Sequence, residues 1–280
     1  MMITAELLQA FQRDMLENEI APATARRYRS VAEDFARWAG DRPITKELLL
    51  DWRNSLSQSA STINVAVAAV NRLIQFLDYG ELRLKHVKTQ RSVYRPACQE
   101  LSREEYERLV TTAERQNKPR LARAIETICA LGIRVSELRY VTVETLEKRE
   151  VTIRNKGKTR TILMSSALVR KLRKYCRCQG INSGPVFVTR RGKALSRTQL
   201  WAEMKALCQA AGVEASKVFP HNLRHLFALT HYRQHKDIVR LADLLGHSSV
   251  NTTRIYLKTS GEEHQRELDA MGLVLRDPAA

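Results

Sequence analysis

Apolar residues spaced three and four apart fill the first eighty residues of the chain, and proline or glycine interrupts them at short intervals. This spacing places the apolar side chains on one face of a helix. Pro22 opens one such segment, Gly40 stops it, and Pro43 precedes the next. The pattern predicts four short helices, at residues 3–18, 22–40, 45–56 and 61–77. Tight connections between them predict a small helical domain.

A second part of the chain begins at a helix start signal, in which Ser102 and Glu105 form a Ser-x-x-Glu capping box. Residues 151–154 and 161–164 alternate as strands do, and the basic stretch 155–158 between them is typical of a hairpin. Helices are expected up to residue 110 and at residues 121–131, 167–178, 198–211, 222–234, 238–245 and 250–257. The expected fold class is therefore mainly α with a small β-hairpin or sheet.

Helical periodicity fades between Glu81 and Gln99, where basic residues accumulate and Pro96 breaks any helix. Such a stretch is typical of an interdomain linker. The chain is long enough for two domains, each with its own core. We expect a helical domain at residues 1–82, a basic linker at 83–99 and a second domain at 100–280.

The net charge of +17 is concentrated in the second part of the chain. Residues 1–80 hold nine basic and ten acidic residues, whereas Val151 to Ala202 contains thirteen Lys and Arg and no Asp or Glu. A block of one sign indicates an anionic partner, because a solvated face normally mixes both signs. Nucleic acid is favoured, since neutralising phosphates releases counterions. An anionic membrane surface is the alternative, but it requires a basic amphipathic helix with aromatic anchors.

The cysteines give no sign of a metal site or a disulfide framework. They are odd in number and contain no Cys-x-x-Cys pair: Cys98, Cys129, Cys176, Cys178 and Cys208. We expect reduced thiols, no metal and no cofactor. No apolar run approaches the ~18 residues that cross a bilayer, and the N-terminal segment has acids where a secretion signal is basic. A cytoplasmic protein without a membrane partner is expected.

Five short stretches of the second part hold residues suited to phosphoryl transfer without metal. They are GIRVSEL with Arg134, NKGK with Lys156, HNLRH with His221 and Arg224, LLGHSS with His247, and TTRIY with Tyr256. Pro220 suits a first helical position, so His221 and Arg224 share one helix face. Each stretch alone is common by chance. Their joint occurrence, in this order and in a basic domain, is far more specific.

In this order the motifs resemble those of the tyrosine recombinase, or phage integrase, family. The match spans about residues 130–257, and the helical first part resembles the family's core-binding domain more loosely. The chain is most similar to compact Xer-type or transposon-type members, because a helical domain that starts near residue 1 leaves no room for an arm-binding domain. The resemblance implies a helical, SAM-like core-binding domain and a mixed α/β catalytic domain of the DNA breaking-rejoining fold.

The resemblance also implies a chemical role for each matched residue. Tyr256 would attack the scissile phosphorus, leaving a 3′-phosphotyrosyl bond and a free 5′-hydroxyl, without ATP or metal. Arg134 and Arg224 would hold the non-bridging oxygens, because guanidinium stays ionised and can bond bidentately. Lys156 would protonate the leaving oxygen as general acid, with Lys158 as the alternative.

The histidines of the motifs have less definite roles. His221 would assist Tyr256 deprotonation or bond the phosphate, and His247 would hydrogen-bond a phosphoryl oxygen, but sequence leaves their division of labour open. The resemblance implies that Glu137 orients Arg134 and that His225 is a structural hydrogen-bonding residue.

The resemblance implies double-stranded DNA recombination sites as partners and a homo-tetramer on two such sites. In that assembly the segment from Gly261 to Leu275 would dock on a neighbouring protomer; the alternative is a helix that caps its own domain. Two other functions stay open. A type IB topoisomerase shares the Arg, Lys, His and Tyr chemistry, and a catalytically silent DNA-binding protein could use the same fold.

Overall fold

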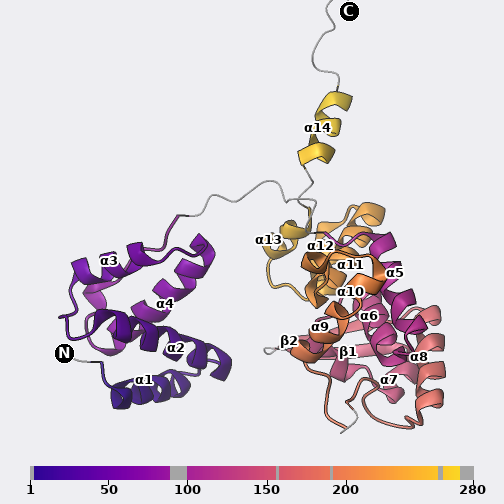
Figure 1. The fold of residues 1–280 in the computed structure, drawn as a ribbon, viewed down its shortest axis with the longest axis horizontal. Coiled ribbons are helices and arrows are strands. Elements are labelled where there is room, and N and C mark those ends of the chain that lie inside the picture. Colours follow the sequence, from indigo (N-terminus) through magenta and orange to yellow (C-terminus); the bar gives the residue numbers. More distant parts are fainter. Residues whose placement is uncertain (1–2, 89–99, 156–157, 190–191, 258–260, 272–280) are drawn as a thin grey trace, which may run out of the picture. The chain divides into compact units, whose positions relative to one another are not determined.

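The computed structural model describes residues 3–88, 100–155, 158–189, 192–257 and 261–271. The chain forms two compact units, residues 1–91 and 92–280. Among the described residues, the regular elements are helices except for one two-stranded sheet (Figure 1), which confirms the expected fold class. None of the described helices is long and apolar enough to span a membrane.

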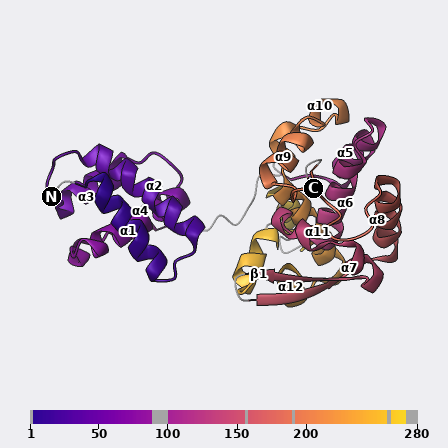
Figure 2. The same ribbon diagram turned by 90° about the horizontal axis from the view of Figure 1, so that it is seen from below.

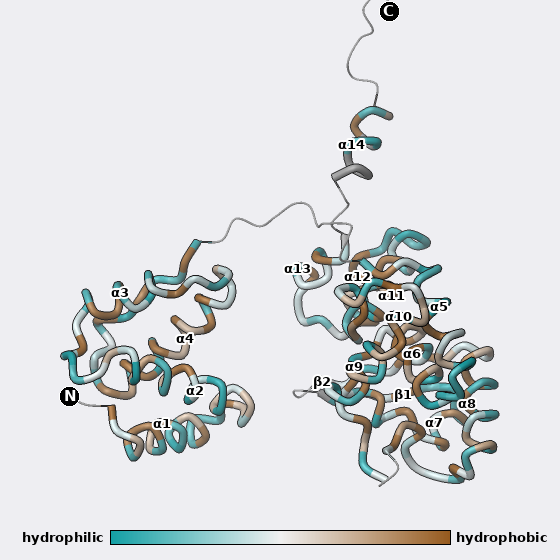
Figure 3. Tube along the Cα trace, in the orientation of Figure 1, coloured by the Kyte–Doolittle hydropathy of each residue, from teal (hydrophilic) through white to brown (hydrophobic). Residues whose placement is uncertain are grey.

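The first unit is the predicted set of four helices: α1 (Ala5–Glu17), α2 (Pro22–Ala39), α3 (Lys46–Ser55) and α4 (Ala60–Phe76), followed by the 3-10 turn η1 (Gly80–Leu82). Hydrophobic and polar segments alternate along these helices (Figure 3), as expected for amphipathic helices around one core. Phe11, Phe35 and Leu73 are fully buried in that core. Each of the four helices begins within two residues of its predicted start.

Two asparagines of α4 hold the segment that follows η1. Asn71 donates to Leu84 O at 2.9 Å and accepts from Leu84 N at 2.8 Å. Asn64, two turns earlier, makes the same pair of bonds with the backbone of Val87, at 3.0 and 2.7 Å. Each side-chain amide thus pairs with both the N–H and the C=O of one residue, as the backbone of a neighbouring strand would. The start of the expected linker therefore packs on the first unit, with Leu84 buried.

The second unit contains ten α-helices in the described residues, with short 3-10 turns and one hairpin. They are α5 (Arg103–Arg115), α6 (Pro119–Leu131), η3 (Val135–Tyr140), α7 (Val143–Lys148), β1 (Glu150–Asn155), β2 (Lys158–Leu163), α8 (Ser166–Gln179), α9 (Arg197–Lys205), α10 (Cys208–Ala211), η4 (Ala215–Lys217), α11 (Pro220–His235), α12 (Ile238–Leu245), α13 (Val250–Thr253), η5 (Arg254–Leu257) and α14 (Gly261–Ala270). Its core is larger than that of the first unit and draws on α5 to α11.

Helices α6 and α11 pack against each other within this unit, with the hairpin beside α7 and α12 (Figures 1 and 2). The strands are antiparallel, with Ile153 opposite Arg160 and Asn155 opposite Lys158. The capping box predicted at Ser102 and Glu105 is present at the start of α5.

Two predicted helices are interrupted. The helix expected at 198–211 is divided into α9 and α10, because Leu207 N bonds Met204 O three residues back instead of continuing the four-residue pattern. The helix expected at 250–257 tightens into the 3-10 turn η5 after Thr253. Periodicity alone does not report such changes of helical pitch.

Candidate active site

Gly132 ends α6 and turns the chain toward η3. Its φ of +60° is left-handed, a conformation that glycine adopts without strain. A Cβ atom there would lie 2.3 Å from the Phe227 ring. Glycine is therefore required on two counts, and the turn places Arg134 at the start of η3.

Arg224 is the buried cation of the site. Its side chain on α11 is 1% exposed, and it donates to two backbone carbonyls, Gly132 O and Leu245 O, each at 2.7 Å. Its Nε has no hydrogen-bond partner among the described residues. Burial lowers the pKa of Arg224 from its ordinary value, and the charge of Arg134 acts in the same direction. Guanidinium still stays charged at neutral pH.

Glu137 is the counter-ion of three arginines. Its Oε2 accepts from Arg134 N at 2.7 Å and from Arg160 Nη2 at 2.9 Å, and its Oε1 accepts from Arg134 Nη1 at 3.0 Å. Arg224 Nη1 lies 4.0 Å from Oε2. Burial acts to raise the pKa of Glu137, but the bond from Arg134 N and the charges of Arg160 and Arg134 hold it below its ordinary value.

His247 follows Gly246 at the end of α12 and is bonded through both ring nitrogens. Nδ1 lies 2.9 Å from Thr253 Oγ1, and Nε2 lies 3.0 Å from Arg224 Nη2. Because guanidinium only donates, Nε2 accepts, which leaves the ring proton on Nδ1. Burial, together with the nearby Arg224 charge, lowers the pKa of His247 to about 4. The imidazole is therefore neutral at pH 7.

Tyr256 lies in η5 and is 3% exposed. Three histidine rings surround it: His225 edge-on at 5.1 Å between centroids, His247 stacked at 5.9 Å, and His221 at 6.4 Å. Tyr256 also lies within electrostatic reach of Arg224. The late tyrosine of the motif set thus contacts the histidine motifs directly.

The two histidines at the start of α11 differ in burial. His221 is exposed, whereas His225 is buried with Nε2 3.7 Å from Glu100 Oε1. Pro220 occupies the first turn of the helix, as predicted, and places both rings beside Tyr256.

The structure brings together five of the six predicted residues: Arg134, His221, Arg224, His247 and Tyr256. The sixth, Lys156, lies outside the described residues. Lys158, the alternative general acid, lies at the start of β2, where its backbone pairs with Asn155. Strand β2, which begins with Lys158, packs against α12.

Arg160 and Thr253 complete the site and were not singled out from the motifs. Thr253 is fully buried and fixes the His247 ring, as described above. Arg160 could have been noticed, because strand alternation places it on the same face as buried Ile162, where a charged residue needs a partner.

The arrangement suits a phosphate. Three guanidinium groups face a single carboxylate, so the site carries two surplus positive charges in partly buried surroundings. Fixed cations of this kind stabilise charge that develops on phosphoryl oxygens. A buried tyrosine beside them supplies a nucleophile. In the described part of the chain no cluster of three or more His, Cys, Asp or Glu could hold a metal ion, and the four described cysteines are free thiols.

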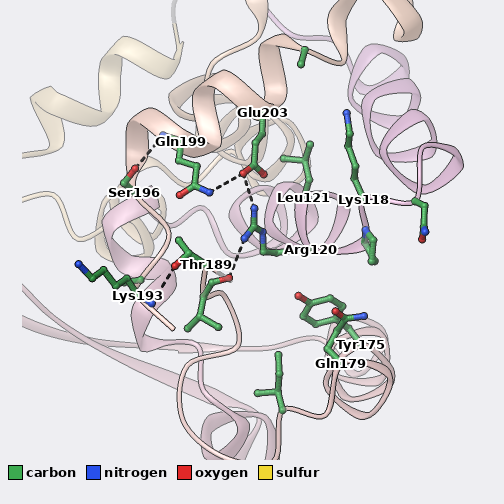
Figure 4. Close-up of a pocket in the computed structure, with 16 residues that line it drawn as sticks. Lys118, Arg120, Leu121, Tyr175, Gln179, Thr189, Lys193, Ser196, Gln199 and Glu203 are labelled. Atoms are coloured by element: carbon green, nitrogen blue, oxygen red, sulfur yellow. Dashed lines mark hydrogen bonds and ion pairs between the residues drawn. The ribbon is translucent and has the colours of Figure 1, made fainter. Parts of the chain in front are cut away.

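A cavity of about 1080 Å³ lies away from these residues, near the start of α6 and α9 (Figure 4). In it, Arg120 donates to Val188 O at 3.1 Å and to Glu203 Oε1 at 2.6 Å, and Gln199 also bonds Glu203. None of the predicted catalytic residues lines this cavity. Cavity size alone would therefore misplace the active site.

Comparison with known proteins agrees with the geometry. Residues 99–263 match the model of the phage integrase family. The tyrosine recombinase XerA of Thermococcus kodakarensis is 29% identical over 96% of both chains. The XerH site-specific recombinase bound to its difH substrate superposes with a TM-score of 0.71 at 20% identity, covering 96% of this chain and 84% of that one.

A third likeness is a lambda integrase tetramer bound to a Holliday junction, with a TM-score of 0.68 and 18% identity over 89% of this chain and 75% of that one. Because the identities to these two solved structures are low, the two likenesses show a shared fold. The family match covers more than half of the chain and includes every motif residue from Arg134 to Tyr256. The chain belongs to the phage integrase family and is a tyrosine recombinase, an enzyme of site-specific DNA recombination.

Proposed function

We propose that the chain cleaves and rejoins duplex DNA with Tyr256 as nucleophile. The tyrosine oxygen attacks the phosphorus, a bond from that oxygen to phosphorus forms, and the bond to the 5′-oxygen breaks. The products are a 3′-phosphotyrosyl bond and a 5′-hydroxyl. One phosphoester replaces another, so rejoining by a 5′-hydroxyl needs no ATP. The observation that carries this proposal is the stacking of Tyr256 on His247, the ring that accepts a hydrogen bond from Arg224.

Arg134 and Arg224 hold the non-bridging oxygens as charge builds on them. Support comes from the two surplus positive charges and from Nε of Arg224, a buried donor without a partner in the described residues. A phosphoryl oxygen is a strong acceptor for such a donor. Glu137 orients Arg134 through its two bonds to that residue.

Protons move at two positions in this scheme. Lys156 gives its proton to the leaving 5′-oxygen. His221 takes the proton of Tyr256, because both nitrogens of His247 are already bonded to Thr253 and Arg224. In this assignment His247 supports Arg224 through Nε2, and Arg224 holds the phosphate.

The assembly follows the same proposal. Residues 1–82 form the core-binding domain, 83–99 the linker and 100–280 the catalytic domain, and four chains act on two double-stranded DNA sites in the cytoplasm. The lambda integrase tetramer supports that number. The C-terminal segment docks on a neighbouring chain, where the contact would cover Leu268 and Met271, two exposed apolar residues on and after α14.

The test is covalent capture. The full chain is incubated with a pool of duplexes of random sequence that carry a nick, and DNA that survives denaturing wash on the protein is sequenced. The expected result is an adduct with one recurring sequence, which Y256F does not form. Absence of any adduct from the intact chain would refute the proposal and favour a silent DNA-binding protein. Adducts on unrelated duplexes with efficient relaxation of supercoiled plasmid would favour a topoisomerase.

A further inference from the structure

Arg160 stands on the inward face of strand β2. Its register partner Ile153 is buried, its neighbour two residues on, Ile162, is buried, and Leu163 on the other face is 76% exposed. The Arg160 side chain itself is 14% exposed. Withdrawing a guanidinium this far from water is costly unless bonds replace those to water. The contacts that Arg160 makes must therefore offset the cost of burying its charge.

The first contact is with Glu137. Arg160 Nη2 donates to Oε2 at 2.9 Å, the same oxygen that accepts from Arg134 N at 2.7 Å. The other carboxylate oxygen accepts from Arg134 Nη1. One carboxylate thus joins the hairpin to the arginine that, in the proposed function, holds the phosphate.

The second contact is with the turn after α12. A Cβ atom built on Gly246 would lie 2.3 Å from Arg160 Nη1 and 2.9 Å from Cδ. The guanidinium therefore lies directly on the Gly246 backbone, which immediately precedes His247. Any side chain at position 246 would displace Arg160 from this place.

We propose that Arg160 is a positioning residue that locks the base of the hairpin to Glu137 and to the turn at Gly246. Lys156 precedes Arg160 by four residues in the sequence, so in the proposed function this lock limits where the general acid can stand relative to the phosphate. The inference rests on the proposed function. Arg160 acts through Lys156 and does not itself transfer a proton.

The two contacts make the test specific to proton donation. In a duplex whose leaving 5′-oxygen is replaced by sulfur, the leaving group is a thiolate, which needs little help from an acid because thiols are far stronger acids than alcohols. We compare single-turnover cleavage of the oxygen and sulfur forms of the captured duplex by R160M, R160K and R115M. Arg115 is exposed in the last turn of α5, outside the basic block 151–202, and serves as the control.

R160M is expected to cleave the oxygen duplex about 100-fold more slowly, the size of a 1 Å misplacement. Its defect on the sulfur duplex should be under about 10-fold, with DNA affinity near that of the wild type. R160K should recover part of the rate because one nitrogen still reaches Glu137, and R115M should match the wild type. Equal defects of R160M on both duplexes, or none, would overturn the inference.

Amide hydrogen exchange tests the lock without any DNA. The peptide holding Gly246 and His247 should exchange faster in R160M than in wild type or R115M, and unchanged exchange would also overturn the inference. Failure of the wild type to form an adduct, by contrast, refutes the proposed function and leaves this measurement to decide on the lock.

Discussion

His247 Nε2 accepts from Arg224 Nη2 at 3.0 Å, so the buried guanidinium of the site is hydrogen-bonded to a neutral imidazole. Protonation of that nitrogen would remove its lone pair and place two cations in contact. The site is therefore built around one protonation state of His247, which Thr253 fixes from the other side of the ring.

This dependence predicts a loss of stability in mild acid. The folded pKa of His247, about 4, lies below the ordinary 6.5, so the unfolded chain binds the proton first as the pH falls. Stability should decline from about pH 6.5 to about pH 4, by roughly 1–3 kcal/mol after allowing for solvent screening. H247Q keeps an acceptor for Arg224 but cannot titrate. Urea unfolding at both pH values should show a smaller decline for H247Q than for the wild type; equal declines would contradict the prediction.

Replacing Gly132 by alanine should cost more than replacing an ordinary left-handed glycine. Both Gly132 and Gly212 have φ near +60°, but only at Gly132 would a Cβ meet another group, the Phe227 ring. G212A should cost about 1 kcal/mol in free energy of unfolding, and G132A about 2–4 kcal/mol because overpacking adds to it. Denaturant titration measures both. F227L should restore part of the loss in G132A, and no restoration would argue against the clash.

Arg224 should not be replaceable by lysine. A single ammonium cannot span the carbonyls of Gly132 and Leu245, which lie on opposite sides of the guanidinium's fork, so one carbonyl would lose its donor. R224K should lose about 1–3 kcal/mol of stability and at least about 100-fold in adduct formation. R240K, at an exposed arginine of α12, is the control and should behave as the wild type. A fully active R224K would contradict the assigned role.

The asparagine pairs on α4 should protect the following segment from proteolysis. N71A removes both bonds to Leu84 and should raise the rate of tryptic cleavage after the exposed Lys85 by about 5- to 30-fold, as expected for a loss of 1–2 kcal/mol in local stability. N54A, at an exposed position of α3, is the control. Timed digestion of the folded full chain with mass spectrometry measures the effect. Equal rates in N71A and N54A would show that the bonds do not hold the segment.

Much of this molecule follows from local sequence. The helices of the first unit and α12 match their predicted ranges closely, because apolar spacing and capping residues act within one element. Three motif residues stand at an element end marked by glycine or proline: Arg134 follows Gly132, His221 follows Pro220 and His247 follows Gly246.

What local sequence does not contain is the pairing between elements. Arg160 and Gly246 are more than eighty residues apart in the sequence, and their contact depends on the hairpin register and on the packing of β2 against α12. The acceptors of Arg224 are carbonyls, which every residue carries, so no residue type marks them. Tertiary packing selects them.

That choice of acceptors bears on how the protein can change over evolutionary time. An arginine anchored to side chains would lose its support with a single substitution of either partner. Leu245 O persists whatever amino acid stands at position 245, provided that α12 still ends there. Substitutions at position 245 therefore leave the hydrogen bond to Arg224 in place, whereas position 132 must stay glycine because its backbone is left-handed.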